Sequence, residues 1–156
     1  MSVGPLILKV PLRWGDMDAY GHINNVEIVR ILEEARVHAF GPPAGTGRPG
    51  VPVDLPVFND LPDGVQTLVV EHRIKYLQPL NYRNVPVEVQ LWVSGLKGAS
   101  LTLAYAIVDP VENVRCVVAE TALAFFDEPA GRLVRLNPEH RRRLEPLLGP
   151  SPFSSR

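Results

Sequence analysis

Apolar and polar residues alternate with a period of two along most of this chain, as they do in half-buried β-strands. Five stretches show the pattern, at residues 6–14, 65–77, 85–95, 100–109 and 114–127. Residues 25–40 instead repeat their apolar positions at helical spacing, with Ile28, Leu32, Ala35 and Ala39 on one face. The pattern therefore predicts a strand, one long helix and then four strands joined by short turns.

The flanking residues indicate where the helices begin and end. Asn24 suits an N-cap with Glu27 in the capping-box position, and the Gly-Pro-Pro at residues 41–43 ends the long helix. Asn137, followed by proline and glutamate, starts a second, short helix that runs to residue 144 or 147. A chain of 156 residues suits a single core, so we expect one domain over residues 1–148 and a flexible tail over residues 149–156.

Residues 41–64 form a long connection with six prolines and five glycines. A connection of this length without a repeating pattern is usually a lid, a binding loop or a mobile segment. Its apolar residues are Val51, Val53, Leu55, Val57 and Phe58. They favour a lining role in a binding pocket, with a plain linker as the alternative.

The order of the elements predicts an α+β fold. Only the sheet can cover the apolar face of the long helix, so we expect a curled antiparallel sheet of five strands wrapped around it. The other face of the sheet also carries apolar residues. A second subunit would cover them, so the sequence predicts a homo-oligomer.

Composition narrows the possible functions. The net charge is −1 and lysine and arginine are not clustered, which argues against nucleic-acid binding. Cys116 is the one cysteine, so an internal disulfide is impossible, as suits a reducing cytoplasm. No apolar run reaches the roughly 18 residues of a membrane span, and the alternating N-terminus differs from a signal peptide. We expect a soluble, cytoplasmic protein that binds no membrane.

The richest chemistry lies in WGDMDAYGHINNVEIVRILEEAR, residues 14–36. Asp16, Asp18 and His22 fall within seven residues, and Asn24 and Asn25 follow at the predicted helix start. A helix N-terminus has unpaired N–H groups and about half a positive charge. Such a site can bind a carbonyl oxygen as it becomes an oxyanion, while a neighbouring carboxylate attacks the carbonyl or activates water.

Each of these residues also has a structural interpretation. Asp18 can cap a turn, Asp16 more readily satisfies loop N–H groups, and His22 is either a base, an orienting partner or a loop-shaping residue. A metal site would need a fourth ligand that the segment does not offer, so we expect no metal. Elsewhere, Arg36 is expected, with its glutamate neighbours, on a solvated or subunit-facing surface, and His72 is expected to be a packed histidine on one strand face with Leu68, Val70, Ile74 and Tyr76.

Three motifs resemble one known family. They are D-x-D-x-x-G-H-x-N-N followed by L-E-E-A-R, the HRIKYLQPL of residues 72–80, and the Gly-Ala-Ser of residues 98–100. Together they resemble the 4-hydroxybenzoyl-CoA thioesterase family of hot-dog-fold acyl-CoA thioesterases, over roughly residues 5–145. The resemblance implies a hot-dog fold, homodimers or homotetramers with active sites between subunits, and no cofactor, since coenzyme A is part of the substrate.

The resemblance also implies roles for individual residues. Asp18 would be the catalytic carboxylate, the backbone N–H of Asn25 the oxyanion donor, and His22 a further catalytic candidate. The predicted substrate contacts are Asn24, Tyr76, Ser100, Lys97 and Arg83. Lys97 and Arg83 lie at turns or strand ends, as do Arg132 and Arg135. Each of these cations either holds the phosphates of coenzyme A or is an ordinary surface charge. The long connection at residues 41–64 departs from the family pattern and leaves the acyl group open.

The resemblance therefore implies hydrolysis of acyl-CoA thioesters, with Asp18 as nucleophile or as general base for water. Two alternatives stay open. One is a hydratase or dehydratase acting on an acyl thioester, and the other is a non-enzymatic acyl-CoA-binding protein of the same fold. The spacing from Asp18 to the helix matches the thioesterase group that the sequence resembles, which argues against the first alternative. An intact Asp18 argues against the second.

Overall fold

The structure, a computed structural model, describes residues 4–43 and 53–153. Its main elements are β1 (Leu6–Val10), α1 (Asn25–Phe40), β2 (Val65–Tyr76), β3 (Val87–Leu96), β4 (Ser100–Val108), β5 (Arg115–Asp127), β6 (Arg132–Leu133) and α2 (Pro138–Leu144). Short 3-10 turns add Trp14–Asp16, Phe58–Asp60 and Glu145–Leu147. In the described part of the chain no helix is long and apolar enough to cross a membrane.

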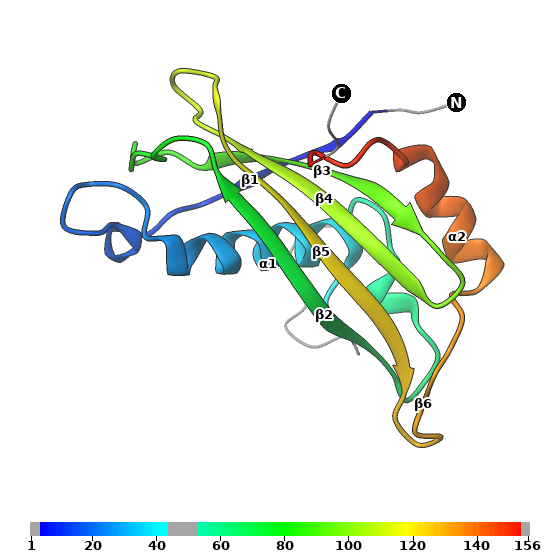
Figure 1. The fold of residues 1–156 in the computed structure, drawn as a ribbon. Helices are drawn as coiled ribbons and strands as arrows, with labels where there is room; N and C mark the ends of the chain where they lie inside the picture. The colour runs from blue at the N-terminus through cyan, green and yellow to red at the C-terminus, as the bar shows by residue number, and fades with distance from the viewer. Residues whose placement is uncertain (1–3, 44–52, 154–156) are drawn as a thin grey trace.

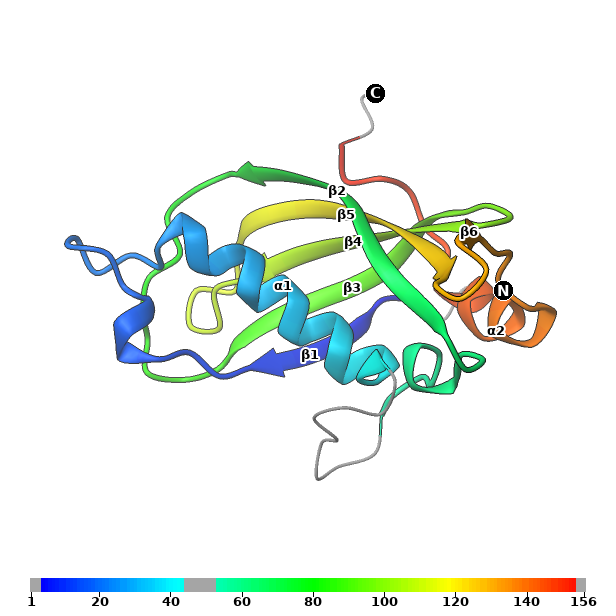
Figure 2. The same cartoon turned by 90° about the horizontal axis from the view of Figure 1, so that it is seen from below.

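The strands form one curved antiparallel sheet in the order β1-β3-β4-β5-β2 (Figure 1). The helix α1 crosses one face of this sheet, and β2 and β1 lie at its two edges (Figure 2). This arrangement confirms the predicted α+β hot-dog fold, a curled five-stranded antiparallel sheet around one long helix. The two-residue strand β6 pairs with the end of β5 and is an addition that the sequence did not predict.

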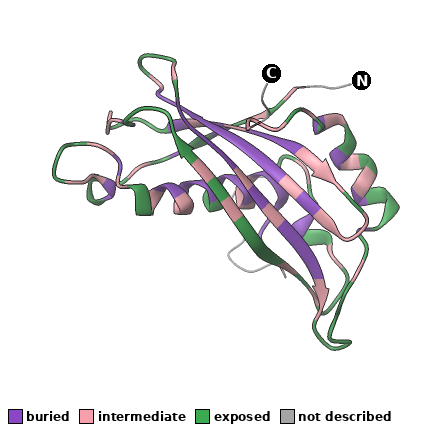
Figure 3. Ribbon diagram, viewed as in Figure 1, coloured by how far each residue is buried: buried purple, intermediate pink, exposed green. Residues whose placement is uncertain are grey.

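The hydrophobic core lies between α1 and the face of the sheet that it crosses. Its fully buried members include Ile28, Ile31 and Leu32 from α1 and Leu91, Leu103, Ile107 and Leu123 from the sheet. Buried positions concentrate on β3, β4 and β5, whereas β2 is mostly exposed or half-buried (Figure 3). The edge strand β2 is therefore the least covered part of the sheet.

The bounds of α1 agree with the sequence, but its capping box was predicted wrongly. The side chain of Asn24 accepts a hydrogen bond from Val26 N–H, as an N-cap does. The carboxylate of Glu27 does not reach back to the cap, because it accepts hydrogen bonds from Arg13 and Arg30 instead. The first strand is also shorter than predicted and ends before Pro11, which has no N–H to donate.

A β-bulge in β2 corrects the predicted faces of that strand. The pairing with β5 shifts between Val69 and Glu71. The extra residue reverses the alternation, so Leu68 pairs with Ala124 on the outer face while His72 pairs with Thr121 on the face toward α1. The prediction that Leu68 and His72 share one face was therefore wrong.

The position of Arg36 also differs from the prediction. Its side chain is only 8% exposed, not solvated. One guanidinium nitrogen lies 3.5 Å from the Tyr105 hydroxyl in the core, and Glu33 lies 3.8 Å from another. His72 packs nearby, with its Nδ1 2.9 Å from Thr121 Oγ1, and burial together with the positive charge of Arg36 lowers its pKa.

The long connection is described only in part, because residues 44–52 lie outside the described residues. Beyond them the chain is packed at the C-terminal end of α1. Leu55 N–H donates to the carbonyl of Ala39, and Val57 N–H donates to that of Phe40. Phe58 is buried, with its ring 5.2 Å from that of Phe40. Val57 and Phe58 are thus part of the core and Leu55 packs against it, so this stretch is not a plain linker.

The C-terminal residues were predicted as a flexible tail from residue 149. In the structure, residues 149–153 make specific contacts instead. Gly149 N–H donates to the carbonyl of Val93, and the indole N–H of Trp92 donates to the carbonyl of Pro150. The tail is thus held on the sheet through residue 153, and residues 154–156 lie outside the described residues.

Candidate active site

A pocket of about 610 Å³ opens at the N-terminal end of α1, a size typical of ligand sites. Five residues singled out from the sequence line it together, namely Asp18, His22, Asn24, Asn25 and Tyr76. Its other walls come from Ile23, Ile28, Leu77, Gln78, Pro79, Leu80 and Val117. The pocket therefore combines a carboxylate, an imidazole and a helix start with an apolar wall.

The loop before α1 holds Asp18 by its own backbone. The N–H of Asp18 donates to the carbonyl of His22 at 2.7 Å. In return, Asp18 Oδ1 accepts from the N–H of Tyr20 at 2.7 Å and from that of His22 at 3.1 Å. Gly21 turns the chain with a φ of 81°. The second carboxylate oxygen, Oδ2, has no donor among the residues described, so it is available to a ligand.

The loop is also joined to the segment that follows β2. Ile23 N–H donates to the carbonyl of Leu80 at 2.7 Å, and Tyr82 N–H donates to that of Gly21 at 3.2 Å. These bonds join segments that are far apart in the sequence. They bring the Tyr-Leu-Gln-Pro-Leu end of β2 over the helix start and so complete the pocket.

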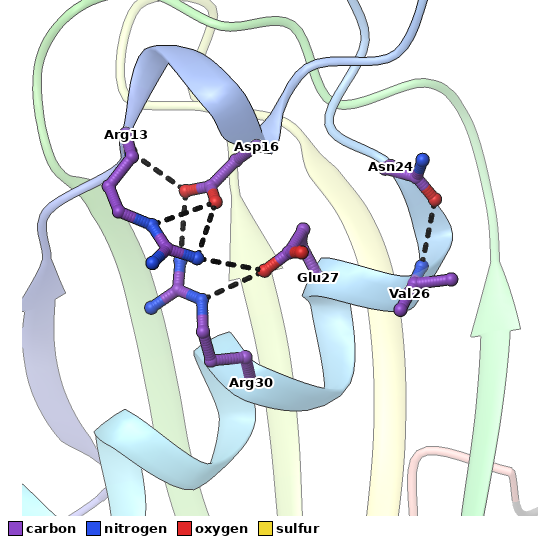
Figure 4. A network of polar contacts seen from close by, with 6 residues as sticks. All are labelled: Arg13, Asp16, Asn24, Val26, Glu27 and Arg30. Atoms are coloured by element: carbon purple, nitrogen blue, oxygen red, sulfur yellow. Dashed lines mark hydrogen bonds and ion pairs between the residues drawn. The ribbon is translucent and has the colours of Figure 1, made fainter.

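Asp16 is buried beneath the loop in a network of charged groups (Figure 4). Its carboxylate accepts hydrogen bonds from the N–H and the guanidinium of Arg13, and from Arg30 at 2.8 Å. Burial alone would raise its pKa, but these bonds outweigh burial and hold the pKa below its usual value. The structure thus agrees with the predicted structural role of Asp16.

We expect Asp16→Asn to destabilise the protein by about 2 kcal/mol, since it replaces charge-assisted hydrogen bonds with neutral ones. A carboxylate with a lowered pKa stabilises the fold above its unfolded pKa, and that contribution is lost as the pH falls through the folded value. Denaturant unfolding at neutral and acidic pH should therefore show a difference that shrinks in acid. A difference that is independent of pH would contradict the ionic role.

The start of α1 leaves one backbone donor unused. Asn24 Oδ1 accepts from Val26 N–H at 3.1 Å (Figure 4). The Asn24 carbonyl accepts from Glu27 N–H at 2.9 Å. The N–H of Asn25 has no acceptor within residues 4–43 and 53–153. It lies at the positive end of the helix dipole and is a free donor for a developing negative charge.

Tyr76 and His22 line the same pocket as this donor. The Tyr76 hydroxyl is 3.4 Å from the Asn25 carbonyl, and the side chain is half exposed at the rim of the pocket. The His22 ring is 6.5 Å from that of Tyr20. Neither of its nitrogens is hydrogen-bonded to another described residue, so the imidazole is available to a ligand.

The structure does not bring the remaining predicted contacts to this pocket. Arg83 forms ion pairs with Asp109 and Glu112, which raise its pKa. Lys97 and Ser100 border the turn between β3 and β4, at the opposite end of the sheet from Val117. As contacts for coenzyme A, these three residues stay predictions.

Sequence reasoning missed several residues that line the pocket. Gln78 and Leu80 belong to a motif that the resemblance used, but no role was derived for them. Val117 lines the same pocket from β5. Alternation predicts which face of a strand a residue occupies but not which strand end meets the helix, so these neighbours were not predictable.

Within the two described ranges, no three His, Cys, Asp or Glu side chains gather closely enough to hold a metal ion. Among the described residues, the pocket offers three groups without a full set of partners. They are the Asp18 carboxylate with one free oxygen, the unbonded imidazole of His22 and the unbonded N–H of Asn25. This set can polarise a carbonyl group and deliver a nucleophile to it.

Comparison with known proteins gives a family and a fold. A sequence model of the thioesterase-like superfamily matches residues 12–144. No curated protein sequence is similar enough to this chain to count as a relative.

Solved structures match over nearly the whole chain. PA5185 from Pseudomonas aeruginosa PAO1 is 23% identical, with a TM-score of 0.70 over 95% of this chain and 94% of that one. YbaW, a probable thioesterase from Escherichia coli, is 21% identical, with a TM-score of 0.68 over 94% and 99%. A thioesterase from Thermus thermophilus, complexed with coenzyme A and Zn, is 22% identical, with a TM-score of 0.68 over 94% and 96%. These likenesses show the fold.

Proposed function

Because the chain belongs to the thioesterase-like superfamily, we propose that it hydrolyses acyl-CoA thioesters to a free acid and coenzyme A. One observation carries the proposal. The Asp18 carboxylate and the unbonded N–H of Asn25 line the same pocket. The coenzyme A found in the Thermus thermophilus neighbour supports the choice of leaving group.

In the proposed reaction the thioester carbonyl oxygen accepts a hydrogen bond from Asn25 N–H. A donor of this kind is worth about 3 to 4 kcal/mol to the oxyanion that forms. Asp18 uses its free Oδ2 in one of two ways. It attacks the carbonyl carbon and forms a mixed anhydride, or it takes a proton from a water that attacks instead.

In either case the C–S bond breaks and coenzyme A leaves as a thiolate. A thiolate is a good leaving group, so the site needs no strong general acid. When Asp18 is the nucleophile, water then hydrolyses the anhydride and restores the carboxylate. We propose that His22 orients the attacking water in both routes, because it lines the same pocket and its ring nitrogens are not hydrogen-bonded to any other described residue.

Release of free thiol from a panel of acyl-CoAs tests this function. Thiol should appear with at least one acyl group and should depend on the protein concentration. A hydratase would change the absorbance of an enoyl-CoA without releasing thiol, and a binding protein would do neither. The panel also reports the preferred acyl group.

We further propose that the working form is a homodimer built on β2. This strand has one free edge, and Tyr76 and Leu77 at its end are about half exposed beside the pocket. The exposed residues Glu71, Arg73 and Lys75 carry one negative and two positive charges. If two copies of β2 pair antiparallel around Arg73, Glu71 of each copy faces Lys75 of the other. These two pairs of opposite charge outnumber the single like-charge pair that the two Arg73 side chains form, so the balance favours self-pairing.

We expect light scattering to give at least twice the 17.2 kDa mass of the chain. Glu71→Lys should weaken this association, because it places like charges opposite one another. The double variant Glu71→Lys with Lys75→Glu restores opposite charges and is the matched control. A stable monomer at micromolar concentration, or a single variant that associates as well as the double variant, would show that β2 is not the interface.

A further inference from the structure

The face of the sheet that points away from α1 carries a second apolar cluster, separate from the main core. Its buried members are Trp92, Ala104, Ala106 and Val118. They come from neighbouring strands, since Trp92 pairs with Ala104 and Ala106 pairs with Val118. Apart from the indole, these side chains are small, so this outer patch is a nearly flat apolar surface.

The C-terminal residues cover this patch. Leu148 forms a parallel bridge with Val93, and Gly149 N–H donates to the Val93 carbonyl at 2.8 Å. A side chain at Gly149 would meet the Trp92 ring at 3.0 Å, so only glycine allows this close approach without a shift. The chain then crosses the ring, where the indole N–H donates to the Pro150 carbonyl at 2.9 Å.

Phe153 is the end of this path. Its ring packs against the outer patch, and the guanidinium carbon of Arg73 lies 4.1 Å from the ring centroid. Its N–H donates to Ser151 Oγ at 3.1 Å. Residues 149–153, here called the C-terminal cap, therefore reach from β3 to β2 across the outer face (Figure 2).

We propose that the C-terminal cap closes a self-association surface, and that the partner it excludes is the outer face of a second copy of this chain. Flat apolar sheet faces pack on one another about 10 Å apart. The patch is bordered by charges of both signs, with Arg73 on β2 in register with Glu120 on β5 and with Arg115 beside Trp92. Charges of both signs on one surface allow opposite charges to meet when two copies pair around a two-fold axis, as in an isologous interface.

The cap is held by contacts that can open. Its attachments to the sheet are the two hydrogen bonds to backbone carbonyls, the bridge at Leu148 and the Phe153 ring. Segments with few buried contacts open locally at low free energy. The cap nonetheless excludes a second copy at micromolar concentration, because a covalently attached segment has an effective concentration in the millimolar range.

Truncation after Leu148 tests the proposal. The shortened chain should have about twice the mass of the full chain by light scattering at the same concentration. Removal of residues 154–156 alone is the matched control and should leave the mass unchanged. Adding Val118→Lys to the truncated chain should restore the mass of the full chain, because a charge then stands within the outer patch.

An unchanged mass after truncation would overturn the proposal, as would a doubled mass that persists with Val118→Lys. If the truncated chain precipitates, Phe153→Ala in the full chain decides the question. This variant keeps both hydrogen bonds of the cap and should associate at lower protein concentration than the unaltered chain. Association at the same concentration as the unaltered chain would overturn the proposal.

Discussion

The Asp18→Asn variant is expected to lose thioester hydrolysis while keeping its fold. Asp18 Oδ1 accepts hydrogen bonds from the N–H groups of Tyr20 and His22. The amide oxygen of asparagine can accept both bonds, so the loop should keep its shape. The change removes the negative charge and the nucleophilic oxygen, and general-base catalysis alone is worth about 10²- to 10⁴-fold in rate. We expect kcat to fall by at least that factor.

Two variants serve as controls for this result. Asp18→Ala removes the same charge but also the two loop hydrogen bonds, so it should lose stability as well as activity. Asp16→Asn alters the neighbouring aspartate and should lose stability while keeping most of its kcat. Free-thiol release measures the activity of each variant, and thermal unfolding of the same samples measures its stability. An Asp18→Asn variant that keeps most of its turnover would show that Asp18 is not the catalytic carboxylate.

Much of the local structure around Asp18 was predictable because it is set by neighbours in the sequence. Asn24 caps α1 through Val26, two residues later, and Gly41 follows the last residue of α1. The strands were found for a similar reason, since alternation needs only a few residues. These predictions depend on short-range patterns, and the structure confirms the bounds of α1 and the presence of all five long strands.

The features that were missed depend on residues far apart in the sequence. The bulge in β2 adds a single residue, and alternation read through it assigned Leu68 to the wrong face. Arg36 looked like a surface charge, but its partner Tyr105 lies on β4, on the other side of the core. The C-terminal cap looked like a loose tail because the partner of Pro150 is Trp92, 58 residues earlier. No local pattern records such partners.

The backbone donor of Asn25 can be tested by Asn25→Pro, because proline has no N–H. Proline is favoured at the first position of a helix, where the missing N–H costs the helix nothing. It also restricts the preceding residue to extended conformations. Asn24 already has φ −62° and ψ 135°, so the loop can accept the change without rearranging.

We therefore expect Asn25→Pro to leave the unfolding temperature nearly unchanged and to lower kcat by about 10²- to 10³-fold, the usual effect of deleting one oxyanion donor. Asn25→Ala is the matched control, because it removes the side chain but keeps the N–H, and it should retain most of the activity. The Asn25 side chain could itself be the essential group, in which case alanine would be as damaging as proline. A proline variant that keeps the activity of the unaltered protein would place the oxyanion elsewhere, since the start of α1 would then contribute no essential donor.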